Sequence, residues 1–315
     1  MLTIFSTPKP FVGHINIIQR NAIRSWTVLH PEVEVILFGD EEGAAEVCRE
    51  FGLRHEPEVK RHEKGPKYLN YFFDRAQEIA KHDVLCYVNC DIILMSDFAK
   101  SIARVQAAHQ NFLMVGRRWD TDVTEPWAFE RADWEDKLRL FARQCNLQRS
   151  PIWIDYFAFS RGLYYKEIPP FVIGRPGWDP WLIWFANSSK VPVVNATPSV
   201  MAIHQNHDYS YHAQGAQGVG ADELAKRNYQ LLGSWLHYHR SDSAPETLGS
   251  NGLQRNWFHW SVPARQGMLR VKAKTWFTLM DITRPIRHPL GLRQRARNSG
   301  PVPSSSNVIE GTLRP

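Results

Sequence analysis

Asp-Val-Leu-Cys-Tyr-Val-Asn-Cys-Asp-Ile-Ile-Leu-Met-Ser-Asp, residues 83–97, is an apolar run that polar side chains interrupt once, at residues 89–91. A run this short and rich in Val and Ile predicts a buried strand, with the Asp91 carboxylate at its end. Open α/β sheets bind ligands beyond the carboxyl ends of their strands, where a carboxylate can hold a divalent cation. We therefore interpret Asp91 as a binding residue. The alternative is a helix N-cap, for which Ser96 and Asp97 are already suited.

The sequence on both sides of this run alternates between strand and helix patterns. Short apolar runs predict strands at residues 2–5, 33–38, 112–115, 151–160, 191–194 and 200–203. Helical spacing of apolar residues predicts helices at 14–29, 41–51, 69–81, 98–108, 131–146, 180–186 and 222–239. This alternation predicts an α/β fold with a mostly parallel central sheet.

The net charge of +6 is unevenly distributed along the 315 residues. Residues 261–297 hold nine Lys and Arg against one acid, so the rest of the chain is slightly acidic. That distribution argues against a nucleic-acid partner for the body of the protein. Apolar spacing within 265–282 predicts a basic amphipathic helix, suited either to an anionic membrane surface or to packing on the body.

The same features predict how the chain is divided. We expect one α/β domain at residues 1–240 and a linker rich in Ser, Pro and Gly at 241–260. A basic helical extension at 261–297 and a disordered end at 298–315 follow. The four cysteines lack CxxC spacing, the apolar start lacks signal-peptide features, and no apolar run reaches 18 residues. These features predict a cytoplasmic protein. It would be peripheral on the inner face of the membrane if the basic helix binds lipid.

Several polar side chains fall at predicted strand or helix ends. Asp40 follows the second strand, where an acid can accept hydrogen bonds from a ribose or base, or cap the helix at 41–51. Lys67 and Asn70 lie at the start of a helix, where backbone N–H groups favour a phosphate. Arg117 follows the strand at 112–115 and could also face an anion.

Three further residues have two interpretations each. Asp155 lies inside the apolar run at 151–160, so it is either paired internally or lines a site. Asp179 begins a helix with Pro180, which suits a cap and is compatible with a catalytic carboxylate. His204 follows the strand at 200–203, where an imidazole is either a hydrogen-bonded structural group or a metal ligand.

The order of these motifs resembles that of GT-A glycosyltransferases, in the nucleotide-diphospho-sugar transferase superfamily. The shared pattern is an acid after the second strand, Asn-Cys-Asp at 89–91, Gly-Trp-Asp at 177–179 and a later His, and it covers roughly residues 1–210. The resemblance implies a Rossmann-like α/β/α sandwich. It also implies transfer of a sugar from a nucleotide-diphosphate donor, a UDP-sugar first of all, with Mn²⁺ or Mg²⁺.

The resemblance also implies roles for individual residues. Asn89 and Asp91 occupy the place of the family's Asp-x-Asp motif, with Asn departing from the first acid, and His204 matches a late metal ligand. Asp179 matches the acid that serves as base towards the acceptor, with Asp155 as the second candidate. Donor contacts are expected from the remaining residues, Thr7 in the first loop, Asp40, Lys67, Asn70 and Arg117.

The predicted function is therefore an inverting, metal-assisted glycosyltransferase acting on a glycan or lipid-linked hydroxyl, as in polysaccharide biosynthesis at a membrane. One alternative is a sugar-phosphate nucleotidyltransferase, which needs a glycine-rich basic loop after the first strand, whereas residues 6–13 hold one Gly and one Lys. The other is a non-catalytic carbohydrate-binding protein, for which 12 Trp, 16 Phe and 10 Tyr would suffice.

Overall fold

The computed structural model describes residues 1–145, 147–207, 220, 222–262 and 264. Two compact units are distinguished, Met1–Met268 and Leu269–Pro315, and every described residue belongs to the first. The predicted basic extension and disordered end lie outside the described residues, except for positions 261, 262 and 264. No helix within the described ranges is long and apolar enough to cross a membrane.

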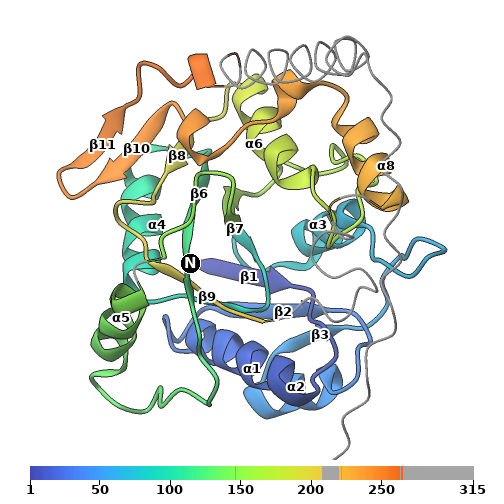
Figure 1. Ribbon diagram of the computed structural model, residues 1–315, viewed down its shortest axis with the longest axis vertical. Coiled ribbons are helices and arrows are strands. Elements are labelled where there is room, and N and C mark those ends of the chain that lie inside the picture. The colour runs from blue at the N-terminus through green and yellow to red at the C-terminus, as the bar shows by residue number, and fades with distance from the viewer. Residues whose placement is uncertain (146, 208–219, 221, 263, 265–315) are drawn as a thin grey trace, which may run out of the picture. The chain divides into compact units, whose positions relative to one another are not determined.

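The described residues form an α/β fold around one mixed sheet (Figure 1). The strands are β1 (Leu2–Ser6), β2 (Glu34–Phe38), β3 (Arg54–Glu56), β4 (Val84–Val88), β5 (Ile92–Ile93), β6 (Leu113–Thr121), β7 (Ile154–Ser160), β8 (Val193–Asn195), β9 (Ala202–Gln205), β10 (Glu246–Gly249) and β11 (Gly252–Arg255). The helices are α1 (Gly13–Thr27), α2 (Ala44–Phe51), α3 (Leu69–Ile79), α4 (Ser96–Ala108), α5 (Trp134–Cys145), α6 (Trp178–Ser188), α8 (Glu223–Leu232) and the short 3₁₀ turns η1 (Trp235–His237) and η2 (Ser241–Ser243).

The strand order is β11-β10-β8-β6-β7-β4-β1-β2-β3, with β9 beside β6 and β5 beside β9. Six of the ten strand pairings among the described residues are parallel. Strand β4, from the run at 83–97, lies between parallel β1 and antiparallel β7. The predicted α/β fold with a mostly parallel sheet is confirmed.

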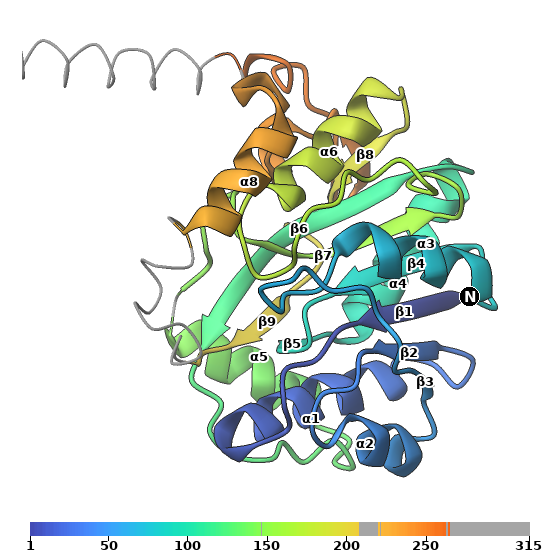
Figure 2. The same cartoon turned by 90° about the vertical axis from the view of Figure 1, so that its right-hand side faces the viewer.

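Helices cover both faces of the sheet, which explains why the central strand β4 is apolar throughout. Alternate residues such as Ile4 and Cys86 pack in one core with α1, α2 and α4. Their neighbours, such as Phe5 and Tyr87, pack in a second core with α3 and α6. Figure 2 shows α1 and α2 on one side of the strands and α6 and α8 on the other. A strand buried on both faces has no polar alternation, as in parallel sheets generally.

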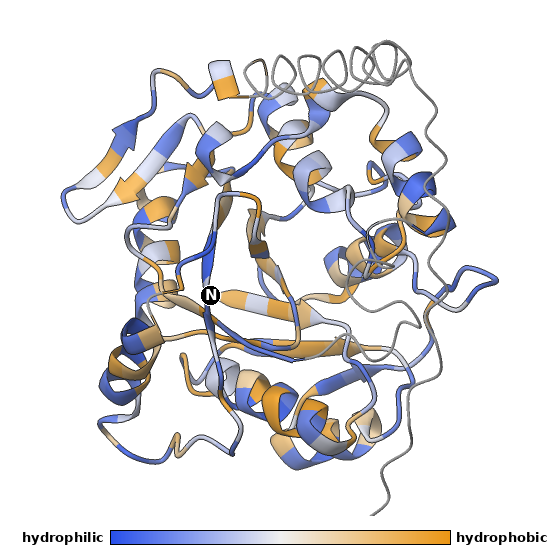
Figure 3. Cartoon of the chain, in the orientation of Figure 1, coloured by the Kyte–Doolittle hydropathy of each residue, from blue (hydrophilic) through white to orange (hydrophobic). Residues whose placement is uncertain are grey.

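Strand β6 is longer than the predicted strand at 112–115, and its added residues include Arg117, Arg118 and Asp120. Figure 3 shows a hydrophilic stretch in β6, whereas β1 and β2 are mostly hydrophobic. The extension pairs with β9 from Arg118↔Ala202 to Thr121↔Gln205. Charged residues are tolerated in a buried strand because they neutralise one another, a pairing that the local sequence does not reveal.

The segment expected as a linker at 241–260 also differs from expectation, because it contributes β10 and β11 to the sheet edge. Strand β10 pairs in parallel with β8, through Glu246↔Val194 and Thr247↔Asn195. Strand β11 closes a hairpin on it. Its short strands and many small polar residues resemble a linker locally, while the pairing partner lies about fifty positions earlier. Two smaller differences are strand β3, which was not among the predicted strands, and α8, which ends at Leu232 rather than near 239.

Candidate functional site

The carboxyl ends of β1, β2, β4, β6 and β9 lie at one edge of the sheet, because these strands run in the same direction. Strand β7 runs the opposite way, so its first residues lie at this edge too. The segments that follow these strand ends carry most of the polar residues singled out in the sequence. Their convergence is the arrangement that open α/β sheets use for ligands.

Asp91, His204 and His207 form a cluster at this edge. The Nε2 atom of His207 lies 3.1 Å from Oδ2 of Asp91, and Nε2 of His204 lies 3.8 Å from the same oxygen. One ligand atom from each residue lies within 4.8 Å of the others. The second carboxylate oxygen of Asp91 is buried without a hydrogen-bond partner among the described residues. Buried carboxylate oxygens normally have a partner, so this oxygen indicates a missing cation or donor.

Backbone pairing explains how Asp91 and His204 come together. Ile92 pairs with His204 across β5 and β9. The buried Gln205 then donates to the Asp91 carbonyl twice, from its backbone N–H at 3.2 Å and from its side-chain amide at 3.1 Å. Its own side-chain oxygen accepts from Asn21 of α1. The turn carrying Asp91 is thus fixed by groups distant in sequence.

The protonation states in the cluster suit a divalent metal ion. Burial alone would raise the pKa of Asp91, but His204, a hydrogen bond from His207 and the charge of Lys9 hold it well below its ordinary value. Burial lowers the pKa of His204, and Arg118 adds to that effect. A carboxylate and a neutral imidazole are the forms that bind metal. Mixed carboxylate and imidazole donors suit Mn²⁺ among other divalent ions.

A network of charges lies directly behind His204. Asp120 Oδ1 is 3.5 Å from Nδ1 of His204 and accepts a hydrogen bond from Arg118 at 2.8 Å. Arg118 also donates to Asp155 at 3.0 Å, and Arg149 donates to the other oxygen of Asp120 at 2.6 Å. Arg118, Asp120 and Asp155 are all buried. The Asp120 carboxylate lies close to the His204 ring, but Nδ1 of His204 makes no hydrogen bond to a described residue.

Of the two interpretations of Asp155, internal pairing agrees with the geometry. Its Oδ2 accepts from Arg118, and its Oδ1 accepts from the Asn89 side chain at 2.6 Å. Asn89 in turn accepts from the Tyr87 hydroxyl at 2.9 Å. An amide can donate to one neighbour and accept from another, as a carboxylate cannot. Asn89 therefore joins Tyr87 to Asp155 through hydrogen bonds. This link gives a structural role to the Asn that stands in place of the first Asp of the Asp-x-Asp pattern.

Asp179 lies in the first turn of α6 and is partly buried. Burial raises its pKa to about 7, and the nearby charge of Asp155 acts in the same direction. The preceding Trp178 packs against Tyr87 with ring centroids 5.6 Å apart, which fixes this turn against the end of β4. The N-cap residue of α6 is Gly177, with φ of 111°, so the cap interpretation of Asp179, two residues later, is wrong. Asp179 is therefore a carboxylate that exchanges its proton near neutral pH.

The ends of β1 and β2 are joined by a buried lysine. The Lys67 amine contacts the Thr7 hydroxyl, lies 3.3 Å from the Pro8 carbonyl and pairs with Glu41 at 2.6 Å. Burial lowers the pKa of Lys67. The Lys67 amine lies so close to the backbone of Gly39 that a Cβ added at Gly39 would be 2.6 Å from it. Lys67 and Thr7, both predicted as donor contacts, thus lie together at the edge that carries Asp91.

The remaining predicted donor contacts are more dispersed. Asp40 is exposed and accepts from Arg61 at 2.6 Å, a contact that lowers its pKa. Asn70 lines a separate polar cavity of about 930 Å³, together with Tyr71 and Asp74 among others. Arg117 lies in β6, where its backbone N–H donates to Thr197 at 3.0 Å. The guanidinium in the network of charges behind His204 is that of Arg118, one residue later.

Sequence reasoning missed four members of this site: His207, Lys9, Arg118 and Asp120. The His204-Gln205-Asn206-His207 run places two imidazoles three residues apart, which was the available signal. Lys9, in the loop after β1, lies with its amine 3.2 Å from His207. Arg118 and Asp120 alternate along β6 and so share one face of the strand. Nothing local marks them as functional.

No protein-family model matches the sequence, and no curated protein matches it. Among solved structures, the chain is similar to glucosyl-3-phosphoglycerate synthase from Mycobacterium tuberculosis in complex with Mn²⁺, UDP and glucosyl-3-phosphoglycerate, at 15% identity over 74% of this chain and 78% of that chain, with a TM-score of 0.42. It is also similar to TarS 1–349 from S. aureus in complex with UDP-GlcNAc, at 8% identity over 73% of this chain and 65% of that chain, with a TM-score of 0.44. Similarity at such identities concerns the fold and assigns no role to a side chain.

Proposed function

We propose that this protein is a GT-A type glycosyltransferase that uses a nucleotide-diphosphate sugar, with a UDP-sugar as the first choice of donor. The observation that carries the proposal is the cluster of Asp91, His204 and His207 beyond the carboxyl ends of the strands. A carboxylate with a buried unpartnered oxygen beside two imidazoles fits a divalent transition metal such as Mn²⁺ better than Mg²⁺, which prefers oxygen ligands. A bound cation supplies Lewis-acid stabilisation of the diphosphate that leaves the sugar.

The chain's own residues provide the rest of that stabilisation. Lys9 lies beside His207 and lowers the pKa of Asp91, so it adds positive charge at the place where the diphosphate would lie. Developing charge on a leaving group is stabilised most by groups already fixed in position. Gln205 fixes the Asp91 backbone by hydrogen bonds, so this ligand is preorganised.

Asp179 is the residue that we propose as general base. Transfer with inversion requires a group that takes the proton of the acceptor hydroxyl on the face of the sugar away from the diphosphate. A pKa of about 7 leaves the Asp179 carboxylate basic enough to accept this proton and still largely ionised above neutral pH. Asp155 is less suited, because both of its oxygens accept hydrogen bonds from Arg118 and Asn89.

The ends of β1 and β2 are proposed to hold the nucleoside. Thr7 and Lys67 lie together there, and Asp40 is exposed one residue beyond Gly39. Asn70 and Arg117 remain predicted donor contacts on sequence grounds alone. The proposed acceptor is a hydroxyl of a glycan or of a lipid-linked sugar.

The test is turnover of a panel of UDP-sugars in the presence of Mn²⁺, measured as release of UDP. We expect the Asp91→Asn and His204→Ala variants to lose this activity. Asp83→Asn is the matched control, because Asp83 precedes β4, Asp91 follows it, and the Asp83 side chain is 95% exposed. Equal turnover in Asp91→Asn and in the control would refute the site. Formation of a UDP-sugar from UTP and a sugar phosphate would instead identify a nucleotidyltransferase.

A further inference from the structure

A group of large apolar side chains lies exposed on the C-terminal part of the described chain. Trp257, Phe258 and Trp260 are 68%, 70% and 67% exposed. Trp235 and Leu236, in η1, are 46% and 60% exposed. Single exposed apolar residues are ordinary on protein surfaces, but a contiguous group marks an interaction site. These five residues are called the aromatic face below.

The segment that carries three of these rings is held in place by hydrogen bonds. The side-chain amide of Asn256 donates to the carbonyls of Asp242 and Ala244, both at 3.0 Å. Its backbone N–H donates to the Pro245 carbonyl at 2.7 Å. Asn256 thus anchors the start of the Trp-Phe-His-Trp run to η2 and β10. The rings are presented outward by a fixed turn, and loose packing of a loop does not account for their exposure.

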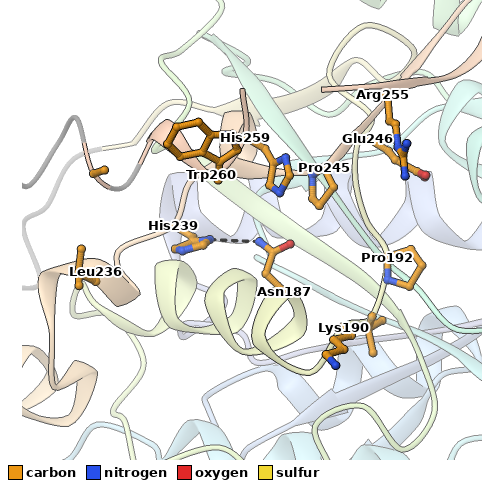
Figure 4. A pocket seen from close by; sticks show the side chains of 12 residues that line it. Asn187, Lys190, Pro192, Leu236, His239, Pro245, Glu246, Arg255, His259 and Trp260 are labelled. Carbon is orange, nitrogen blue, oxygen red and sulfur yellow. Dashed lines mark hydrogen bonds between the residues drawn. The ribbon is translucent and has the colours of Figure 1, made fainter. Parts of the chain in front are cut away.

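A cavity joins the two parts of the aromatic face. Leu236 of η1 and Trp260 both line a space of about 510 Å³, which Figure 4 shows with Asn187 and His239 linked by a hydrogen bond of 3.1 Å. Lys190 and Arg255 line the same cavity. The Arg255 guanidinium also lies 4.8 Å from the centre of the Trp257 ring. Leu236 and Trp260 thus border one cavity, which Glu246 also lines, and a cation lies against Trp257.

The chemistry of the following sequence identifies the partner. Residues 261–297, directly after the exposed rings, hold nine Lys and Arg against one acid. Trp rings favour the boundary between lipid headgroups and acyl chains. Basic residues next to such rings are attracted to anionic lipids near the membrane surface. Aromatic rings followed by cations match the two layers of a lipid surface, the interfacial layer and the anionic headgroups.

We propose that the aromatic face binds the surface of an anionic membrane, with Trp257, Phe258 and Trp260 entering the interfacial layer. Such binding grows with the apolar area buried and with attraction between basic residues and anionic headgroups. The aromatic face supplies the first contribution and the basic sequence after it supplies the second. This inference concerns where the protein acts and holds whichever reaction it catalyses.

The test is cosedimentation of the full chain with vesicles of phosphatidylcholine containing 30 mol% phosphatidylglycerol. We expect the triple variant Trp257→Ala/Phe258→Ala/Trp260→Ala to lower the partition coefficient about tenfold or more, because it removes the apolar contribution. Leu140→Ala is the matched control, since Leu140 is 61% exposed on α5, outside the aromatic face. It should bind like the wild type. Vesicles of phosphatidylcholine alone, or 0.5 M salt, should weaken binding of the wild type.

Two results would overturn the proposal. One is a wild-type chain that does not sediment with the anionic vesicles. The other is a triple variant that binds them as well as the wild type does, which would exclude the rings as the anchor. A third measurement is light scattering. If the wild type is a dimer, the triple variant is a monomer and neither binds vesicles, the aromatic face joins two copies of the chain. Urea unfolding of each variant checks that the fold is intact.

Discussion

The Asp179→Asn substitution should stabilise the protein, and more so as the pH rises. The folded pKa of Asp179 is about 7 against an ordinary value of 3.8, because burial opposes the charged form. Between these two pH values unfolding allows the carboxyl group to ionise, so the free energy of unfolding falls as pH rises and levels off above pH 7. Asparagine has nearly the same shape and carries no charge, so its side chain avoids this loss.

The magnitude follows from the two pKa values. Ionising a carboxyl group with a pKa of about 7 instead of 3.8 costs the folded state about 4 kcal/mol at most, at 1.36 kcal/mol for each tenfold change. Asp179 is partly exposed, so we expect about 2 to 4 kcal/mol above pH 7. The advantage of Asp179→Asn over the wild type should grow by about 2 kcal/mol between pH 5 and pH 8.

Urea unfolding followed by tryptophan fluorescence at pH 5, 6, 7 and 8 measures this difference. The matched control is Asp136→Asn, because Asp136 also lies in the first turn of a helix, α5, but is exposed. Its effect on the unfolding free energy should be the same at every pH. An Asp179→Asn effect that is equally independent of pH would refute the reasoning. In the same variant, UDP release with acceptor present should be lost, whereas in the wild type it should rise with pH through about 7.

Two further substitutions test how the site is held together. Arg118→Met leaves Asp120 and Asp155 buried without their shared cation, so it should lower the unfolding free energy by about 3–5 kcal/mol. The control Arg131→Met, at an exposed pair with Asp133, should change the unfolding free energy little. Similar effects of the two substitutions would count against the buried network. Gly39→Ala places a Cβ 2.3 Å from Glu41 Oε2 and 2.6 Å from the Lys67 amine, at a φ of +118°. Backbone strain alone should lower the unfolding free energy by about 1–3 kcal/mol, and the clash should lower it further. Gly65→Ala, at a φ of +100° with nothing within 4 Å, isolates the strain, and an equal loss in both variants would show that the Lys67 contact adds nothing.

The fold class could be predicted because periodicity is a local property of the sequence. The run at 83–97 became β4, β5 and the start of α4, with Asp91 at the predicted strand end. Strand β10 could not be predicted in this way. Its residues are ordinary for a linker, and only pairing with β8 makes them a strand. Pairing between distant segments depends on the tertiary structure, which no window of sequence contains.

The candidate site could likewise be predicted only in part. Asp91 and His204 were predicted from their strand ends as ligands of one metal site, and the structure brings them within 3.8 Å. Lys9 and His207 meet only because the loop after β1 lies beside the end of β9. Asp155 left two interpretations open, since the partner that decides between them, Arg118, belongs to another strand. Side-chain identity therefore suggests candidates, and only the fold shows their partners.

The most direct test of the account is the affinity of the protein for Mn²⁺ in the presence of UDP, measured from the loss of the free-ion electron paramagnetic resonance signal. The account predicts saturable binding of one ion by the wild type and by Asp83→Asn. Asp91→Asn and His204→Ala should bind at least about tenfold more weakly, the loss expected when a ligand or its direct support is removed. Equal affinity in all four proteins would contradict the assignment of Asp91, His204 and His207 as the cation site.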